Sequence, residues 1–418
     1  MESRDIFNEW TKYALDRRLK ERRIDLGSMA ELSKTKILAI TGARRSGKSS
    51  VLMLLTQHLR ERGEKVGFVN CEDSRLDPRL MLEEALKWFG DEGYLILDEI
   101  TSSDDWEGWL SRIHDMLKGR LKVIVSSSRA GLVSPSKPLR GRMMIVEVFP
   151  LSFEEYLDFK GIVSEPTTSG RGRLEEALRQ YLKFGGFPEL MELEPEMAKI
   201  TVLNDYFREI LGLDVAHVSN TDISAVQLFG RYALASKLFS ASKALNYFKG
   251  LGHKIGKEKM LQLEHYCQAS YLFFFVPIFT RSMKDQSQYQ RKVYPVDTGL
   301  FYAIAGTEER GRLLESVAFL RLRRRLKPGE EICYWRDVKG REVDFIIRRG
   351  VEVLAAYQVC YDLSNQSTLE REVDALMKCS TEFGLKRVSI ITWSSSGEMK
   401  EAGLTIRLTP AIDWLRRD

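Results

Sequence analysis

A glycine-rich stretch near the start of the chain combines the residue types and spacing of a triphosphate-binding turn. It has the form G-x-x-x-x-G-K-S with one more serine behind it, and its residues are Gly42, Ala43, Arg44, Arg45, Ser46, Gly47, Lys48, Ser49 and Ser50. Glycines let the backbone curl so that successive N–H groups face one phosphate, and a helix that starts here adds partial positive charge. Lys48 would reach the β- and γ-phosphates, and the Ser49 hydroxyl would be a ligand of Mg²⁺. The stretch therefore predicts a binding site for ATP and Mg²⁺.

Two adjacent carboxylates could complete this site. Asp98 and Glu99 follow four bulky apolar residues at 94–97. Such a run is typical of a strand buried in a parallel sheet, and ligands bind beyond the carboxyl ends of these strands. We expect Asp98 to hold Mg²⁺ and Glu99 to act as the general base that polarises the attacking water. The alternative, a solvated acidic turn, is disfavoured by the glycine loop upstream.

The strands and helices expected around the glycine loop and the two carboxylates predict how these two motifs come together. An apolar run at 37–40 precedes the glycine loop, and apolar residues recur at helical spacing after it. Further strands are expected at 66–70, 121–125 and 143–148, with helical stretches between them. This alternation predicts right-handed crossovers and an α/β fold with a parallel sheet. Because a whole strand–helix unit separates the two motifs, we expect a sheet with a strand inserted between them.

In a sheet of this type, the strand that carries a run of three serines, residues 126–128, would lie close to the γ-phosphate. One of these hydroxyls could orient the attacking water, and Ser128 is the preferred candidate. A serine-rich turn without a catalytic role is the alternative.

Composition bounds the remaining possibilities. The 418 residues are 44% hydrophobic and 29% charged, with a net charge of +5, which excludes global disorder and coiled coils. The longest apolar run, 271–279, is far shorter than the roughly 20 residues of a membrane span. The charged N-terminus lacks the apolar core of a signal peptide, and the five scattered cysteines form no C-x-x-C pair. We therefore expect a cytoplasmic protein without a membrane partner.

Several segments outside the glycine loop make the likeness to a known family specific. They are L-R-G-R at 139–142, F-P-L-S-F-E-E-Y at 149–156, G-G-F-P-E at 185–189 and Y-P-V-D-T-G-L at 294–300. With the glycine loop, they resemble an archaeal and bacterial family of AAA-type P-loop ATPases. Many members of that family end in a domain of unknown function related to restriction endonucleases.

The resemblance implies four domains. They are an ATPase core with an N-terminal helix at 1–150, a helical lid or linker at 151–220, a winged-helix-like domain at 221–305 and a restriction-endonuclease-like domain at 306–418. It also makes Arg142 a candidate contact to the γ-phosphate, from its own chain or from a neighbouring subunit of a homo-oligomer. A surface salt bridge is the alternative for Arg142. Arg44 and Arg45 could face the phosphates or clamp the N-terminal segment.

The middle of the chain suggests DNA as a partner. After a helical region with a polar loop near 167–173, helices are expected through 238, from 240 or 242 to 249, and over 257–268. A hairpin of 271–279 and 291–296 would follow, with the wing at 281–290, and this is winged-helix order. The recognition-helix candidate, 257–268, has two lysines but also two glutamates and no arginine, the commonest base reader. Basic clusters at 17–23 and 321–327 could contact double-stranded DNA or be solvated helix faces. The domain could also serve only as a packing module.

The last segment matches the nuclease pattern in part. Glu315, expected to open a helix, and Asp344, on a strand, match metal ligands of the resembled fold, but the E-x-K position has Gln358 and Cys360. Glutamine is a poor Mg²⁺ ligand and cysteine carries no positive charge, so we expect a fold that has lost nuclease activity. The sequence thus predicts an ATPase that drives a conformational switch coupled to DNA or protein binding. A nucleotide-regulated DNA-binding protein with little turnover is the alternative, and a nuclease is less favoured.

Overall fold

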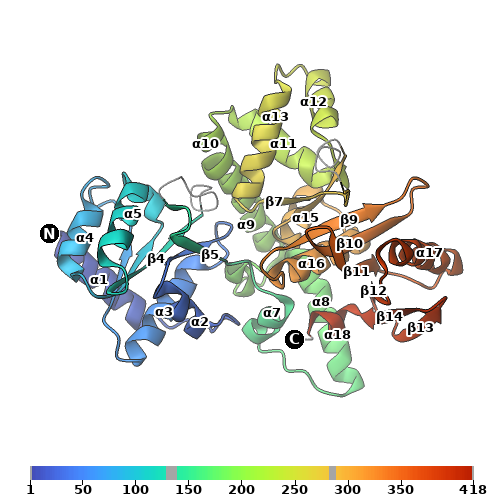
Figure 1. Ribbon diagram of the computed structural model, residues 1–418, viewed down its shortest axis with the longest axis horizontal. Coiled ribbons are helices and arrows are strands. Elements are labelled where there is room, and N and C mark those ends of the chain that lie inside the picture. The colour runs from blue at the N-terminus through green and yellow to red at the C-terminus, as the bar shows by residue number, and fades with distance from the viewer. Residues whose placement is uncertain (1, 129–138, 282–288, 417–418) are drawn as a thin grey trace. The chain divides into compact units, whose positions relative to one another are not determined.

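The computed structural model describes residues 2–128, 139–281 and 289–416 (Figure 1). The chain divides into two compact units, Met1–Pro150 and Leu151–Asp418. The expected domain boundaries after residues 220 and 305 lie inside the second unit, where they stay predictions.

The first unit is built on a parallel sheet with the order β2-β3-β4-β1-β5. Its strands are β1 (Ile37–Thr41), β2 (Val66–Asn70), β3 (Gly93–Asp98), β4 (Leu121–Ser127) and β5 (Met143–Glu147). β4 lies between β1, which leads into the glycine loop, and β3, which ends at Asp98. The predicted inserted strand is therefore confirmed.

Helices cover both faces of this sheet, which explains why β1 and β3 are buried and continuously apolar. They are α1 (Ser3–Asp16), α2 (Leu26–Ser33), α3 (Lys48–Glu61), α4 (Met81–Phe89) and α5 (Trp106–Leu117), with a 3₁₀ turn, η1 (Ile100–Ser102). Alternate residues of β1 enter two separate cores: Ile37 packs with residues of α1, α4 and α5, and Leu38 with residues of α2 and α3. The apolar positions expected on α3 are all buried.

Helix α1 also protects the edge of the sheet. β2 is the outermost strand on its side, so one row of its peptide groups has no strand partner. The Thr11 hydroxyl donates to the Phe68 carbonyl at 3.1 Å and accepts from the Phe68 N–H at 3.0 Å. The Trp10 indole donates to Asp73 at 2.8 Å. The N-terminal helix therefore satisfies polar groups that the edge strand would otherwise expose.

The second unit begins with a helical region, as expected. Its elements are α7 (Phe153–Lys160), α8 (Thr168–Phe184), η3 (Pro188–Met191), α9 (Glu196–Glu209), the π-helical η4 (Ile210–Ala216), α10 (His217–Ser219) and α15 (Thr298–Ala305). The prediction of a polar loop near 167–173 is wrong, because these residues form the N-cap and the start of α8. Thr167 is its N-cap and accepts from the Gly170 N–H at 2.9 Å, so the polar residues cap a helix instead of connecting two.

The family-specific segments after residue 150 meet at one buried junction. Asp297 accepts hydrogen bonds from the N–H groups of Gly186 at 2.7 Å and Gly299 at 2.8 Å. A Cβ on Gly185 would lie 1.6 Å from an Asp297 carboxylate oxygen, and one on Gly186 would lie 2.3 Å from the Leu151 carbonyl oxygen. These glycines are therefore required by close packing, and the motifs that identify the family here are structural.

The next elements follow the order predicted for a winged helix. They are α11 (Ile223–Ala235), β6 (Leu238–Phe239), α12 (Ala241–Gly250), α13 (Lys257–Ala269), β7 (Phe273–Val276) and β8 (Arg291–Pro295). β7 and β8 pair antiparallel, and β6 adds a third strand in the order β6-β8-β7. The first helix, expected to continue through residue 238, ends at Ala235, because Leu238 and Phe239 pair with β8 instead. Most of the expected wing, 282–288, lies outside the described residues.

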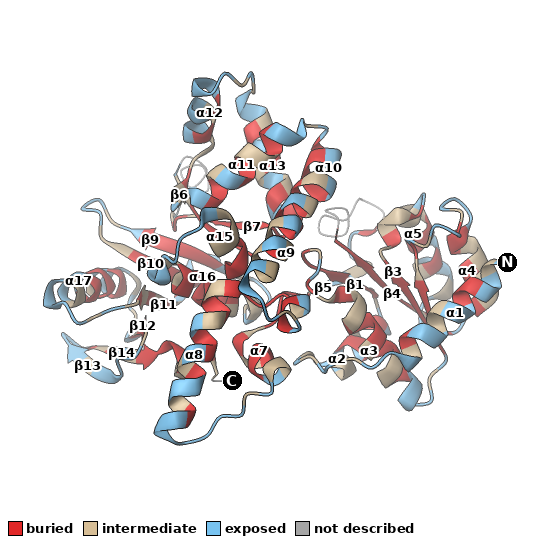
Figure 2. Cartoon of the chain, turned by 180° about the vertical axis from the view of Figure 1, so that it is seen from behind, coloured by how far each residue is buried: buried red, intermediate tan, exposed pale blue. Residues whose placement is uncertain are grey.

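The C-terminal part contains a mixed sheet with the order β13-β14-β12-β11-β10-β9. Its elements are α16 (Arg310–Arg324), β9 (Glu330–Arg336), β10 (Glu342–Arg349), β11 (Glu352–Cys360), α17 (Gln366–Phe383), β12 (Arg387–Thr392), β13 (Gly397–Glu401), β14 (Leu404–Pro410) and α18 (Ala411–Leu415). Buried residues concentrate where helices contact the sheet (Figure 2). α17 packs on one face, while α16 contacts β11 and α18 contacts β12 and β14. Glu315 lies in the middle of α16 and does not open it.

Candidate nucleotide site

The glycine loop connects β1 to α3 through backbone conformations that favour glycine. Gly42 has φ +149°, and a Cβ there would lie 2.1 Å from the Val148 carbonyl oxygen. Gly47 has φ +96° and is the N-cap of α3, with no side-chain cap. The first N–H groups of a helix have no acceptor within it, so the amides of Lys48, Ser49 and Ser50 form a donor set at the start of α3. This donor set fits a phosphate.

The Lys48 ammonium lies inside the loop. Its side chain is 5% exposed, and Nζ donates to the carbonyl oxygens of Gly42 and Ala43, both at 3.2 Å. Nζ also lies 3.8 Å from a Glu99 carboxylate oxygen. The loop thus holds a buried cation against its own carbonyl oxygens and near Glu99, and contact of Lys48 with the β- and γ-phosphates stays a prediction.

Asp98 is buried at the end of β3, next to the loop. Burial, together with repulsion from Glu99, raises the pKa of Asp98 from 3.8 to about 6, although hydrogen bonds from Ser126 and Ser49 oppose the shift. The contact between Ser49 and Asp98 brings together a hydroxyl and a carboxylate, the oxygen donors that Mg²⁺ prefers. These two residues would hold Mg²⁺, and the ion would supply positive charge to the phosphate oxygens.

The raised pKa of Asp98 predicts a pH dependence of Mg²⁺ binding. Below about pH 6 the carboxyl is protonated in the folded protein and loses its affinity for the ion. We expect the gain in ATP affinity that Mg²⁺ provides to fall about tenfold per pH unit below this value. Titration with a fluorescent ATP analogue at several pH values, with and without Mg²⁺, measures this gain. Asp98→Asn should remove it at every pH, and a gain in the wild type that stays constant down to about pH 5 would contradict the assignment.

Glu99 is held between the loop and β4. It has φ +50°, a left-handed conformation that is strained for a residue with a side chain. Its N–H donates to the Ser126 hydroxyl at 3.0 Å, and its carboxylate accepts from the Ser128 N–H at 3.1 Å and the Ser128 hydroxyl at 3.4 Å. The strained turn therefore aims the carboxylate at Lys48. Ser128 contacts Glu99 directly, and its role in orienting water stays a prediction.

Arg142 lies at the other end of the sheet. Its carbonyl accepts from the Ile37 N–H, at the start of β1, whereas the glycine loop follows the end of β1. The five residues of β1 separate the two ends by roughly 16 Å. The guanidinium forms a two-point ion pair with Asp115 of α5, with both contacts at 2.8 Å. Contact to the γ-phosphate from the same chain does not fit this position, and contact in a neighbouring subunit stays a prediction.

Arg22 is a loop contact that the sequence did not reveal. Its guanidinium donates to the Ser46 carbonyl at 3.0 Å and to the Phe149 carbonyl at 3.0 Å. It therefore joins the N-terminal segment to the glycine loop, a role considered above for Arg44 or Arg45. Arg44 is half-buried and Arg45 is exposed with φ +65°, and their roles toward the phosphates stay predictions. The only signal for Arg22 was its place in the basic cluster 17–23.

The nuclease-like residues surround a lysine. Lys292 of β8 is buried, and its Nζ lies 3.0 Å from Glu315, 2.9 Å from Glu342 and 2.7 Å from Asp344. Although burial alone would lower the pKa of Lys292, these carboxylates raise it well above its ordinary value, so the ammonium stays charged. Tyr294 also donates to Glu315 at 2.5 Å. An internal ammonium thus lies among the acidic groups, where a metal ion would otherwise have to bind.

Gln358 takes no part in this cluster. Its amide accepts from the Asp344 N–H at 3.0 Å and donates to Glu372 of α17 at 2.6 Å. The described residues contain no group of three or more His, Cys, Asp or Glu side chains placed to hold a metal ion. The geometry gives the nuclease hypothesis no support.

The recognition-helix candidate, α13, presents little positive charge. Lys259 donates to the Ser219 carbonyl at 3.0 Å, and Arg291 of β8 is paired with the half-buried Glu264. Lys257 is exposed next to the exposed Glu258. Two basic side chains at α13, Lys259 and Arg291, are therefore bound within the protein itself.

The fold and the site define the class of protein. An inserted-strand parallel sheet, a glycine loop at the start of α3 and Asp98–Glu99 at the end of β3 make the first unit a P-loop ATPase. Residues 34–157 match a family model described as an AAA domain, and residues 175–311 and 310–388 match two models described as domains of unknown function, DUF8612 and DUF4143.

Whole-chain relatives identify the family. The chain is 30% identical over 382 residues to a Methanocaldococcus jannaschii protein named Uncharacterized protein MJ1544, covering 88% of this chain and 84% of that one. A Haemophilus influenzae protein, named Uncharacterized protein, is 25% identical over 397 residues, covering 91% and 94%. The chain belongs to this archaeal and bacterial family of AAA-type P-loop ATPases with a C-terminal domain of unknown function.

The chain is also similar, at low identity, to two solved structures. The Walker-type ATPase PABY2304 of Pyrococcus abyssi aligns over 70% of this chain and 99% of that chain, with 15% identity and a TM-score of 0.43. AMPPCP-bound DnaA from Aquifex aeolicus aligns over 58% and 91%, with 18% identity and a TM-score of 0.29. Within the described residues, no helix is long and apolar enough to cross a bilayer.

Proposed function

We propose that this ATPase uses ATP and Mg²⁺ to drive a conformational switch coupled to the binding of DNA or a protein partner. The closeness of Lys48, Asp98 and Glu99 is the observation that supports it, because these are the residues that we expect to bind the phosphates, to hold Mg²⁺ and to act as the general base. A switch requires ATP and ADP to favour different conformations, by roughly 5.5 kcal/mol for a near-complete shift.

Three further features belong to this proposal. An arginine supplied by a neighbouring subunit would make the active form a homo-oligomer, with Arg142 as the candidate. The element order α11, α12, α13, β7 and β8 supports a winged helix, which is a DNA-binding arrangement in other proteins. The five cysteines are free and buried, which suits the reducing cytoplasm.

Phosphate release, measured with and without duplex DNA at low salt, tests the proposal. We expect the wild type to release phosphate from ATP in a Mg²⁺-dependent reaction and Lys48→Ala to release none. A change in turnover on adding DNA would support coupling to DNA. Unchanged turnover would remove DNA from the proposal, and absence of release by the wild type would leave only nucleotide-regulated binding.

A further inference from the structure

A basic groove lies on the face of the C-terminal sheet that α16 and α18 cover in part. It consists of two adjoining hollows of about 420 and 230 Å³ that share Ser389 and Arg407. Six cationic side chains line it: Arg321, Arg325, Lys327, Arg387, Lys400 and Arg407. The lining includes neither Glu315 nor Asp344, so the groove is separate from the lysine-filled cluster.

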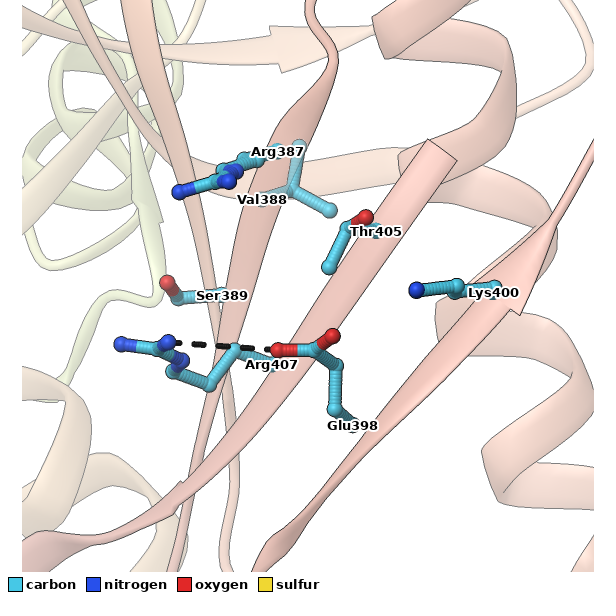
Figure 3. Close-up of a pocket in the computed structure, with 7 residues that line it drawn as sticks. All are labelled: Arg387, Val388, Ser389, Glu398, Lys400, Thr405 and Arg407. Atoms are coloured by element: carbon cyan, nitrogen blue, oxygen red, sulfur yellow. Dashed lines mark ion pairs between the residues drawn. The ribbon is translucent and has the colours of Figure 1, made fainter. Parts of the chain in front are cut away.

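The strand register explains how these residues gather. Arg387 of β12 and Lys400 of β13 both lie opposite Thr405 of β14, and Ser389 lies opposite Arg407 one row further along. Residues two apart on a strand share a face, so both rows point to the same side. Figure 3 shows these side chains on three adjacent strands. The intervening residues enter the apolar core under α17, so the polar and apolar side chains of these strands lie on opposite faces of the sheet.

The groove is strongly cationic. Its two carboxylates are already in ion pairs: Glu398 lies 3.9 Å from Arg407, and Glu330 lies 3.0 Å from Arg349, which is outside the lining. Arg387, Lys400, Arg407, Arg325 and Lys327 are exposed. Most of these cationic side chains are therefore accessible to a ligand from solvent, and a polyanion would complement their charge.

We infer that this groove binds the sugar–phosphate backbone of a nucleic acid. The hydroxyls of Ser389 and Thr405, which lie in these rows beside the basic residues, suit phosphate oxygens as hydrogen-bond partners. The groove gathers far more cationic side chains than α13, where Lys257 is exposed beside Glu258. The inference deepens the proposed coupling to DNA and moves the main contact surface from α13 to the C-terminal sheet.

Two sets of substitutions with equal charge change test this assignment. The groove set is Arg387→Gln, Lys400→Gln and Arg407→Gln. The control set is Lys249→Gln, Lys254→Gln and Lys257→Gln, which neutralises exposed lysines in and around α12 and α13. Fluorescence anisotropy of a labelled single strand, and of the duplex of the same sequence, gives the affinity over a range of salt concentrations. Phosphate release without nucleic acid verifies that each protein retains its ATPase unit.

We expect the groove set to weaken binding by more than about tenfold at low salt. It should also reduce the slope of log K against log salt by about 2 for the single strand, since each lost phosphate contact removes about 0.7. The control set should change both values much less. If the two sets lose the same affinity, or if the control set loses more, the assignment of the groove is wrong, while the proposed coupling to DNA can still hold. If the wild type releases phosphate but binds neither the single strand nor the duplex, then both the groove assignment and the proposed coupling to DNA are wrong. The ATPase activity would be unaffected by this result.

Discussion

Replacing Glu99 by glutamine should slow ATP hydrolysis about 10²- to 10⁴-fold while ATP binding remains, because only the carboxylate can accept a proton from the attacking water. Glutamine keeps the length of the side chain and an oxygen that can accept from the Ser128 N–H, the contact that now holds Glu99 at 3.1 Å. Single-turnover hydrolysis of radiolabelled ATP, together with equilibrium binding of ATP, separates the two effects.

Glu92→Gln is a matched control for this experiment. Glu92 is exposed and lies just before the first residue of β3, at the end of the strand away from the glycine loop. Glu92→Gln therefore makes the same chemical change far from the loop. We expect its turnover to equal that of the wild type. Full turnover by Glu99→Gln would show that another group is the base, and loss of ATP binding would assign Glu99 to the structure of the site.

Replacing Lys292 by methionine should destabilise the second unit by about 3–5 kcal/mol. The substitution leaves Glu315, Glu342 and Asp344 around a buried apolar side chain, and removal of one partner from a buried charged cluster has this cost. Hydrogen exchange of β8 and β10, followed by mass spectrometry, measures the loss where it arises, without requiring the two units to unfold together.

The sign of the pH dependence supplies a second readout. Burial raises the pKa of Asp344 to about 7, even with Lys292 beside it, and loss of the ammonium should raise it further. In Lys292→Met the ionised form of Asp344 opposes folding, because it is a buried charge without a cation beside it. Protonation of Asp344 removes this charge, so the destabilisation caused by Lys292→Met should shrink as the pH falls. Adding Asp344→Asn should recover part of the loss.

Lys237→Met is the control for Lys292→Met. Lys237 is exposed, and its ammonium lies 3.6 Å from Glu309, so its removal should cost less than about 1 kcal/mol. Equal exchange in Lys292→Met and the wild type would mean that the cluster contributes nothing to stability.

Local patterns predicted the strands and the turn that carry the candidate nucleotide site, because these parts are close in sequence or follow strand ends. The G-x-x-x-x-G-K-S motif and the apolar run before Asp98 each specify a turn and a strand, and the number of intervening elements indicated where β4 lies. Ser128 was selected in the same way, as the residue that follows β4, and it contacts Glu99.

Long-range contacts of single polar residues left no such signal. Arg22 joins the loop from 24 residues away, and Lys292 meets Asp344 across 52 residues. Each is one basic residue among many in the sequence, and only the tertiary fold selects it. The predicted contact of Arg142 with the γ-phosphate of its own chain does not fit the structure for a related reason. The L-R-G-R motif identifies the neighbours of Arg142 along the chain, but it does not tell at which end of the sheet Arg142 lies.

The contact between Thr11 and Phe68 has a consequence for how the ATPase unit can be isolated. The AAA-domain match begins at residue 34, but a protein cut at that point would lack α1 and its hydroxyl. β2 would then offer unpaired peptide groups to other molecules, and intermolecular strand addition would compete with folding. We therefore expect that an ATPase unit able to fold by itself must include α1, well before the nucleotide motif.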